Sequence, residues 1–139
     1  MDGGLKDKRG GLREGATPEA IRTDLSDLLA KPGTYKPSQW GMRHGKDDGR
    51  KGYGWLGVMR RVDNPDAVST EISVGTNIDG KEMDIPLMVP TLGRQEVLHL
   101  LSTPEDQLDF DRPVMRSILD KAQRHATSRL RQGLSVWRD

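Results

Sequence analysis

Residues 68–89 read VSTEISVGTNIDGKEMDIPLMV, with apolar and polar side chains alternating on both sides of Asp79-Gly80. An Asp-Gly dipeptide favours the type I′ turn of a two-residue hairpin loop, because both central residues of that turn have positive φ. Folding the chain about this dipeptide gathers the apolar side chains on one face, and a shift of one residue would break that match. The opposed pairs are Thr76–Met83, Val74–Ile85, Ile72–Leu87 and Thr70–Val89. The sequence therefore predicts an antiparallel hairpin of fixed register.

The apolar face of this hairpin needs a cover, and two helical patterns follow it. The first pattern contains Val97, Leu98, Leu100 and Leu101 and ends at Thr103-Pro104. The second begins near Asp111-Arg112-Pro113 and ends at Gly133, because glycine is favoured just after a helix C-terminus. Its apolar face carries Val114, Ile118, Ala122, Ala126 and Leu130. We expect an α+β fold, an antiparallel β-hairpin or small sheet covered by two C-terminal helices.

The polar face of the hairpin carries Ser69, Glu71, Ser73, Asn77, Glu82 and Asp84, with Pro86 favouring an edge strand or a bend. Its three carboxylates could form an acid pair or a hard-metal site. Carboxylates on the solvent side of a hairpin are ordinary, however, and no base, nucleophile or phosphate-binding loop accompanies them. His44, His99 and His125 also lack the spacing of a zinc helix. We therefore expect no enzyme, no metal and no cofactor.

The first part of the chain has a different composition. Residues 1–16 contain few apolar side chains, Thr17-Pro18 favours the start of a helix over 18–30, and residues 31–54 are rich in Gly and Pro. The apolar stripe of that helix needs a surface, either on its own domain or on a neighbouring chain. Residues 53–61 indicate a short strand or extended segment, and Asn64-Pro65-Asp66 a turn into the hairpin. We predict an extended arm over 1–51, a domain over 52–133 and a tail over 134–139.

The composition limits the classes of function. The chain has 139 residues, a formal net charge of +1 and no cysteine, which excludes disulfides, thiolate metal sites and a cysteine nucleophile. No apolar run reaches the roughly 20 residues of a membrane-spanning helix, and the N-terminus lacks the pattern of a secretory signal. These features predict a protein without a membrane span that is made and retained in a cytoplasm.

Two sets of side chains are candidates for binding. Partner proteins could contact Ile21, Leu25, Leu28, Leu29, Tyr35, Trp40 and Trp137, although Trp137 could instead pack on the core. Nucleic acid could contact a basic set that is interleaved with aromatic residues, namely Arg43, Lys46, Arg50, Lys51, Arg60 and Arg61. This basic segment could equally be a solvated loop, and its aromatic side chains anchors at a protein interface. The last helix has a second basic face, solvated or in contact with phosphates, with Arg116, Lys121, Arg124 and Arg131.

Several segments resemble a small domain of tailed-bacteriophage proteins, found in virion-associated proteins and large phage polyproteins. They are GWLG at 54–57, VSTEISVG at 68–75, NIDGKE at 77–82, IPLMVPTL at 85–92, ILDKA at 118–122 and His125-Ala126. The resemblance covers roughly residues 52–133 and implies a setting, the phage particle, rather than a reaction.

The expected function is that of a minor structural protein of the virion. It would be made in the host cytoplasm, be present in multiple copies and fasten to capsid, portal, tail or internal proteins through residues 1–51. Such an arm can wrap a large surface when it orders on a partner. The alternatives are a phage protein that contacts DNA through residues 36–61 and an accessory module of a cell-wall-degrading virion protein.

Overall fold

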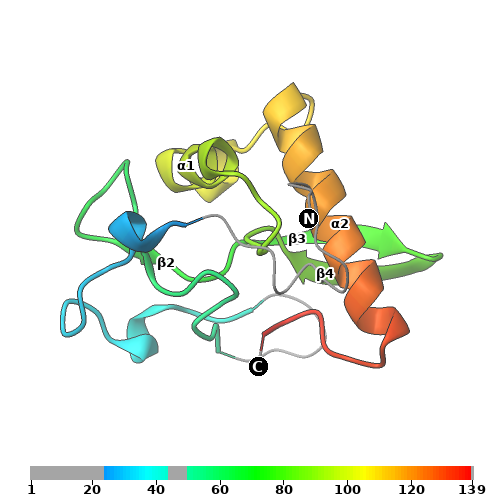
Figure 1. The fold of residues 1–139 in the computed structure, drawn as a ribbon, viewed down its shortest axis with the longest axis horizontal. Helices are drawn as coiled ribbons and strands as arrows, with labels where there is room; N and C mark the ends of the chain where they lie inside the picture. The colour runs from blue at the N-terminus through cyan, green and yellow to red at the C-terminus, as the bar shows by residue number, and fades with distance from the viewer. Residues whose placement is uncertain (1–23, 44–49, 139) are drawn as a thin grey trace, which may run out of the picture.

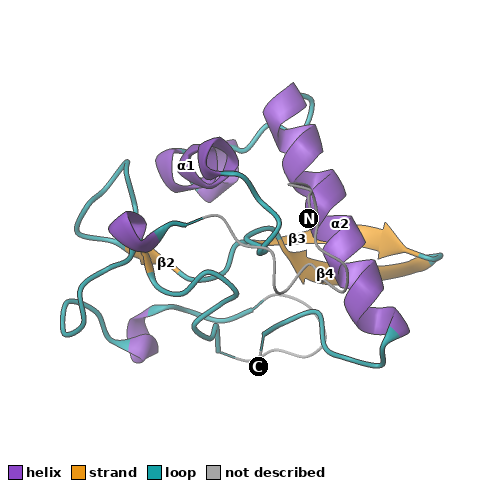
Figure 2. Ribbon diagram, in the orientation of Figure 1, coloured by secondary structure: helices purple, strands orange, loops and turns teal. Residues whose placement is uncertain are grey.

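The computed structural model describes residues 24–43 and 50–138, and the chain has an α+β fold. Strands β1 (Met59–Arg60) and β2 (Val68–Ser69) form one small antiparallel sheet, and β3 (Ser73–Ile78) and β4 (Lys81–Pro86) form another. Helices α1 (Arg94–Ser102) and α2 (Pro113–Arg131) follow. Single 3-10 turns lie at Ser26–Leu28, Pro37–Gln39 and Glu105–Gln107. Helix α2 crosses the β3–β4 hairpin, and α1 lies beside the other sheet (Figures 1 and 2).

The predicted hairpin and its register are confirmed over β3 and β4. Val74 pairs with Ile85, and Thr76 pairs with Met83, as the alternation requires. The loop consists of Asp79 and Gly80 with φ of 51° and 84°, which are the positive values that a type I′ turn needs. The Asn77 side-chain oxygen accepts a hydrogen bond of 2.9 Å from Gly80 N–H and closes the turn. Strand β4 has no further strand beside it among the described residues and ends at Pro86.

The hairpin is shorter than the sequence pattern indicates. Beyond Ser73, one more hydrogen bond joins Leu87 N–H to the Ile72 carbonyl over 2.7 Å, and the ladder then ends. The expected Thr70–Val89 pair is wrong, because Val68 and Ser69 instead pair with Arg60 and Met59. The turn predicted at residues 64–66 brings β2 back alongside β1, since Ala67 N–H donates to the Asn64 carbonyl at 2.9 Å.

The core lies between the hairpin, α1 and α2. The apolar face of α2 is buried through Met115, Ile118, Ala122 and Ala126. The core also contains Ile72, Ile85, Leu87, Met88, Val89, Leu92, Val97, Leu100 and Leu101. Leu130, expected on the same face of α2, is 40% exposed, because it stands in the last turn of the helix. Gly133, with φ of 73°, follows the helix as predicted.

The helix expected over 18–30 takes another form where it is described. Residues 18–23 lie outside the described residues, and residues 24–30 contain only the 3-10 turn Ser26–Leu28. Leu29 then forms a bridge with Met59, and Ala30 N–H donates to the Val58 carbonyl at 2.8 Å. Pairing with the segment around β1 therefore replaces the α-helical hydrogen bonds. Leu25 is buried in the core, and Leu28 packs against it.

Candidate functional site

Three aromatic rings from two segments meet beside the turn Pro37–Gln39, and we call Tyr35, Trp40 and Tyr53 the aromatic patch. The Tyr35 and Trp40 ring centroids lie 5.9 Å apart. The Trp40 and Tyr53 rings meet edge to face at 4.9 Å. Trp40 ends the 3-10 turn and donates its backbone N–H to the Pro37 carbonyl at 3.1 Å. This hydrogen bond fixes the backbone of Trp40 against the turn.

The patch combines exposed apolar surface with an unpaired polar atom. Tyr53 is 54% exposed, and Met42, two residues after Trp40, is 52% exposed. The Trp40 Nε1 atom is buried and finds no hydrogen-bond acceptor within the described part of the chain. Tryptophan and tyrosine are enriched at protein interfaces because they offer a large apolar area and one polar group each. The arrangement suits contact with another macromolecule.

A buried ion pair holds the segment that carries this patch. Glu71 accepts hydrogen bonds from Arg43 Nε at 2.8 Å, from Arg43 Nη2 at 2.6 Å and from Gly52 N–H at 3.0 Å. The Arg43 guanidinium also lies 4.6 Å from the centre of the Trp137 ring. We call Arg43, Gly52, Glu71 and Trp137 the clasp. We call residues 35–43 and 50–53, which carry the aromatic patch, the patch segment. The clasp joins this segment, at Arg43 and Gly52, to the loop before β3 and to the C-terminal tail.

The tail is fixed by further contacts at Trp55. Its Nε1–H donates to the Val136 carbonyl at 3.1 Å, its ring meets that of buried His125 at 4.8 Å, and the Arg129 guanidinium lies 4.8 Å from its centre. Arg138 donates to the Gly54 carbonyl at 3.1 Å. Of the two interpretations of Trp137, the structure therefore shows packing on the core.

The other proposed partner-binding residues are spread over different environments. Leu29 is 41% exposed and Tyr35 is half-buried, whereas Leu25 is buried in the core. Ile21 lies outside the described residues. The structure thus brings together Tyr35 and Trp40 and adds Tyr53, one of the aromatic residues interleaved with the basic segment.

The proposed nucleic-acid residues are mostly engaged within the chain. Arg43 belongs to the clasp, and Arg61 donates to Asp63, Ser69 Oγ and the Thr103 carbonyl. Its hydrogen bonds to Asp63 are the largest cause that lowers the pKa of that carboxyl. Arg50 and Arg60 are exposed, and Lys51 is half-buried with Glu105 at 3.8 Å. Lys46 lies outside the described residues.

The carboxylates of the hairpin's polar face do not converge. Glu71 was expected on the solvent side and is instead 3% exposed within the clasp, because the chain leaves the hairpin before Ser73. Glu82 accepts from Asn77 Nδ2 at 3.3 Å. Within residues 24–43 and 50–138, no group of three or more His, Asp or Glu side chains is placed to hold a metal ion. No helix among these residues is long and apolar enough to cross a membrane.

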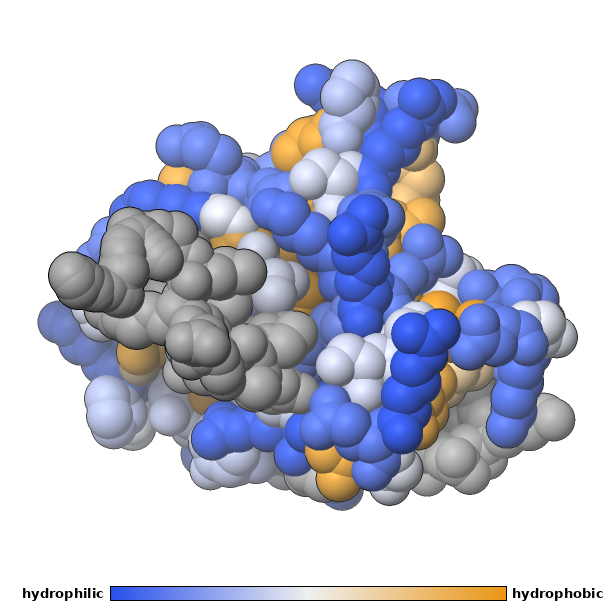
Figure 3. All heavy atoms as spheres, turned by 45° about the vertical axis from the view of Figure 1, so that its right-hand side comes forward, coloured by the Kyte–Doolittle hydropathy of each residue, from blue (hydrophilic) through white to orange (hydrophobic). Residues whose placement is uncertain are grey.

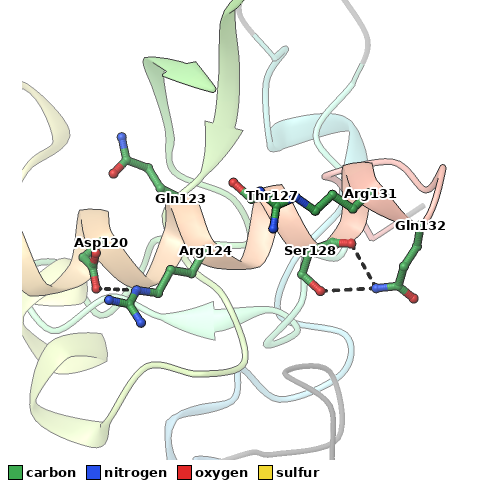
Figure 4. A pocket seen from close by; sticks show the side chains of 7 residues that line it. All are labelled: Asp120, Gln123, Arg124, Thr127, Ser128, Arg131 and Gln132. Carbon is green, nitrogen blue, oxygen red and sulfur yellow. Dashed lines mark hydrogen bonds and ion pairs between the residues drawn. The ribbon is translucent and has the colours of Figure 1, made fainter. Parts of the chain in front are cut away.

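A shallow groove runs along the outer face of α2 (Figure 4). Its lining consists of Asp120, Gln123, Arg124, Thr127, Ser128, Arg131 and Gln132. Asp120 pairs with Arg124 at 3.0 Å, and Gln132 donates to the Ser128 carbonyl at 3.0 Å. Figure 3 shows this side of the molecule as mainly hydrophilic, with apolar side chains in separate areas. Such a surface is typical of a solvated helix face.

Comparisons with protein-family models, with curated proteins and with solved structures found no match to this chain.

Proposed function

We propose that this chain is a structural protein of a tailed-phage particle and fastens to another virion protein through the aromatic patch. The single observation that supports this proposal is the gathering of Tyr35, Trp40 and Tyr53 at the surface. The phage setting rests on the resemblance of the segments between residues 54 and 126.

The patch has properties of a contact that a partner would complete. Edge-to-face rings fill a fixed shape at small cost in conformational entropy, so they serve well as anchors. The clasp holds the patch on a rigid base, which reduces the ordering cost of binding.

The DNA-contact alternative has less support. Two of its six cations, Arg43 and Arg61, hold carboxylates of this chain, and releasing either would leave Glu71 or Asp63 unpaired. A formal net charge of +1 also gives little long-range attraction to DNA.

The test is incorporation into particles. Tyr53→Ala and Trp40→Ala remove exposed and half-buried rings, and Val62→Ser is the control, because Val62 is 51% exposed and lies outside the patch. Particles assembled with each full-length variant are purified and the copy number of the protein is measured by quantitative mass spectrometry. We expect a several-fold loss for both patch variants and a normal copy number for Val62→Ser, with all three folded by circular dichroism.

Two results would overturn the proposal. One is normal incorporation of a folded Trp40→Ala, Tyr53→Ala double variant. The other is the absence of the wild-type protein from purified particles. DNA binding that weakens steeply with salt, and that is lost on charge reversal of exposed Arg50 and Arg60, would favour the alternative.

A further inference from the structure

The two outer edges of the β3–β4 hairpin differ in their ability to pair with another strand. Ile72 and Leu87 are joined by a ladder hydrogen bond, so hydrogen-bonded and non-hydrogen-bonded pairs alternate from there to the turn. This alternation directs the backbone groups of Ser73, Gly75 and Asn77 outward on β3. On β4 it directs outward those of Glu82, Asp84 and Pro86.

The edge of β4 is protected against pairing. Pro86 has no N–H to donate, and Glu82 and Asp84 would bring carboxylates together if this edge met a second copy of itself. Prolines and charges are the usual means by which proteins protect strand edges. The edge of β3 has neither, and among the described residues no backbone group from outside the hairpin bonds to Ser73, Gly75 or Asn77.

Helix α2 also covers less of β3 than of β4. Helix α2 packs mainly against β4 and reaches β3 through one hydrogen bond of 2.7 Å from Gln123 Nε2 to Thr76 Oγ1. Gly75 is exposed and carries no side chain, so side chains of the described residues leave the middle of the β3 edge uncovered.

We propose that β3 pairs antiparallel with β3 of a second copy of this chain, about a two-fold axis at Gly75. The sequence of the strand is self-complementary about that point. On the apolar face Ile72 would oppose Ile78, and Val74 would oppose Thr76. On the polar face Ser73 would oppose Asn77, and Gly75 would oppose Gly75. A two-fold axis requires each surface to match itself in this way.

This pairing would convert two two-stranded hairpins into one four-stranded sheet. A two-stranded hairpin is marginal alone, and additional strands increase its stability. The inference goes beyond the proposed function and does not depend on it, because the β3 edge and the aromatic patch are separate surfaces.

The experiment is sedimentation equilibrium of the full chain over a range of concentrations, with two charge variants. Ser73→Asp with Asn77→Asp places like charges opposite each other twice in the dimer. Ser73→Lys with Asn77→Asp places opposite charges there. Asn77→Asp keeps the oxygen that accepts from Gly80 N–H, so both variants preserve the turn.

We expect a concentration-dependent dimer for the wild type. The like-charge variant should raise the dimer dissociation constant by about tenfold relative to the opposite-charge variant, since like charges directly opposite destabilise a strand pair. Equal melting temperatures at a concentration where both are monomeric show that the folds are intact.

A monomer at every concentration would overturn the proposal. A dimer equally stable in both charge variants would also overturn it and would place the interface elsewhere. If β3 amides of a monomer resist hydrogen exchange, another part of the same chain covers the edge, which also overturns the proposal. If they do so only with another virion protein present, that protein supplies the strand.

Discussion

The β3–β4 hairpin and the clasp fix two neighbouring parts of this chain by different means. The hairpin joins residues that are close in sequence, through alternation and the turn at Asp79-Gly80. The clasp joins Arg43 to Glu71 and then to Trp137, which are far apart in sequence. The hairpin therefore depends on backbone conformation, whereas the clasp depends on the burial of one ion pair.

The largest effect is expected at the clasp. Glu71→Met would remove the carboxylate that accepts two hydrogen bonds from Arg43, whose side chain is 11% exposed, and should lower the free energy of unfolding by about 3–5 kcal/mol. The double variant Arg43→Met, Glu71→Met should recover part of this loss. Replacing a buried ion pair by hydrophobic side chains of similar volume often leaves stability unchanged or raises it. Urea denaturation checks both, with Glu82→Gln as the exposed control. A double variant less stable than Glu71→Met would contradict the role given to the pair.

The next largest loss of stability is expected at Gly54, two residues after Gly52 of the clasp. Gly54 has φ of 74°, and a Cβ on it would lie 1.9 Å from the Thr70 carbonyl oxygen. Gly54→Ala should therefore cost about 3 kcal/mol or more, since strain and overlap with backbone add. Gly33→Ala is the matched control, because Gly33 has φ of 88° and nothing within 4 Å. Equal melting temperatures of the two variants would show that the contact with Thr70 is unimportant.

A smaller effect is expected at the hairpin turn. Gly80→Val forces a β-branched residue to positive φ and should destabilise the protein by roughly 1–3 kcal/mol. Gly80→Asn, which tolerates this conformation better, should lose less. An unchanged melting temperature of Gly80→Val would show that the turn does not control the hairpin.

The smallest effect concerns the contact between the two helices. Glu96 accepts from Lys121 Nζ at 2.7 Å and Gly93 N–H at 2.8 Å, and also from Ser117. Burial acts to raise the pKa of Glu96, but these hydrogen bonds outweigh it and the pKa lies below its ordinary 4.5. A carboxyl with a lowered folded-state pKa stabilises the protein above about pH 4.5 and loses that contribution as the pH falls through the folded value. Glu96→Gln should cost about 1 kcal/mol at pH 7 and less at pH 3, measured by urea denaturation. A cost that does not change with pH would contradict this explanation.

The parts of the fold that local patterns specify were predictable. Alternation about Asp79-Gly80 predicts the register, and Pro113 and Gly133 predict the ends of α2. Alternation also misplaces Glu71, because a pattern of period two cannot show where a strand stops. The sequence likewise predicts Arg43 as a nucleic-acid contact and not as part of a buried ion pair, because Glu71 lies 28 residues away and no local pattern connects them.

The aromatic patch was predictable only in part. Its three residues stand out in the sequence as aromatic side chains in a Gly-rich segment, but their meeting depends on the bridge between Met42 and Arg50 and on the bond from Lys51 N–H to the Gly41 carbonyl. The turn Pro37–Gln39 gives a local signal through its proline. The clasp that fixes both ends of the segment gives none.

Hydrogen exchange of the wild type and Glu71→Gln, followed residue by residue, tests most directly whether the clasp rather than the hairpin holds the patch segment. Glu71→Gln keeps the shape of the side chain and removes its charge. We predict that protection falls in residues 34–43, 50–55 and 134–138 and stays unchanged at the paired amides of β3 and β4, because the two parts open separately. Equal loss of protection in the hairpin, or no loss in the patch segment, would contradict this division.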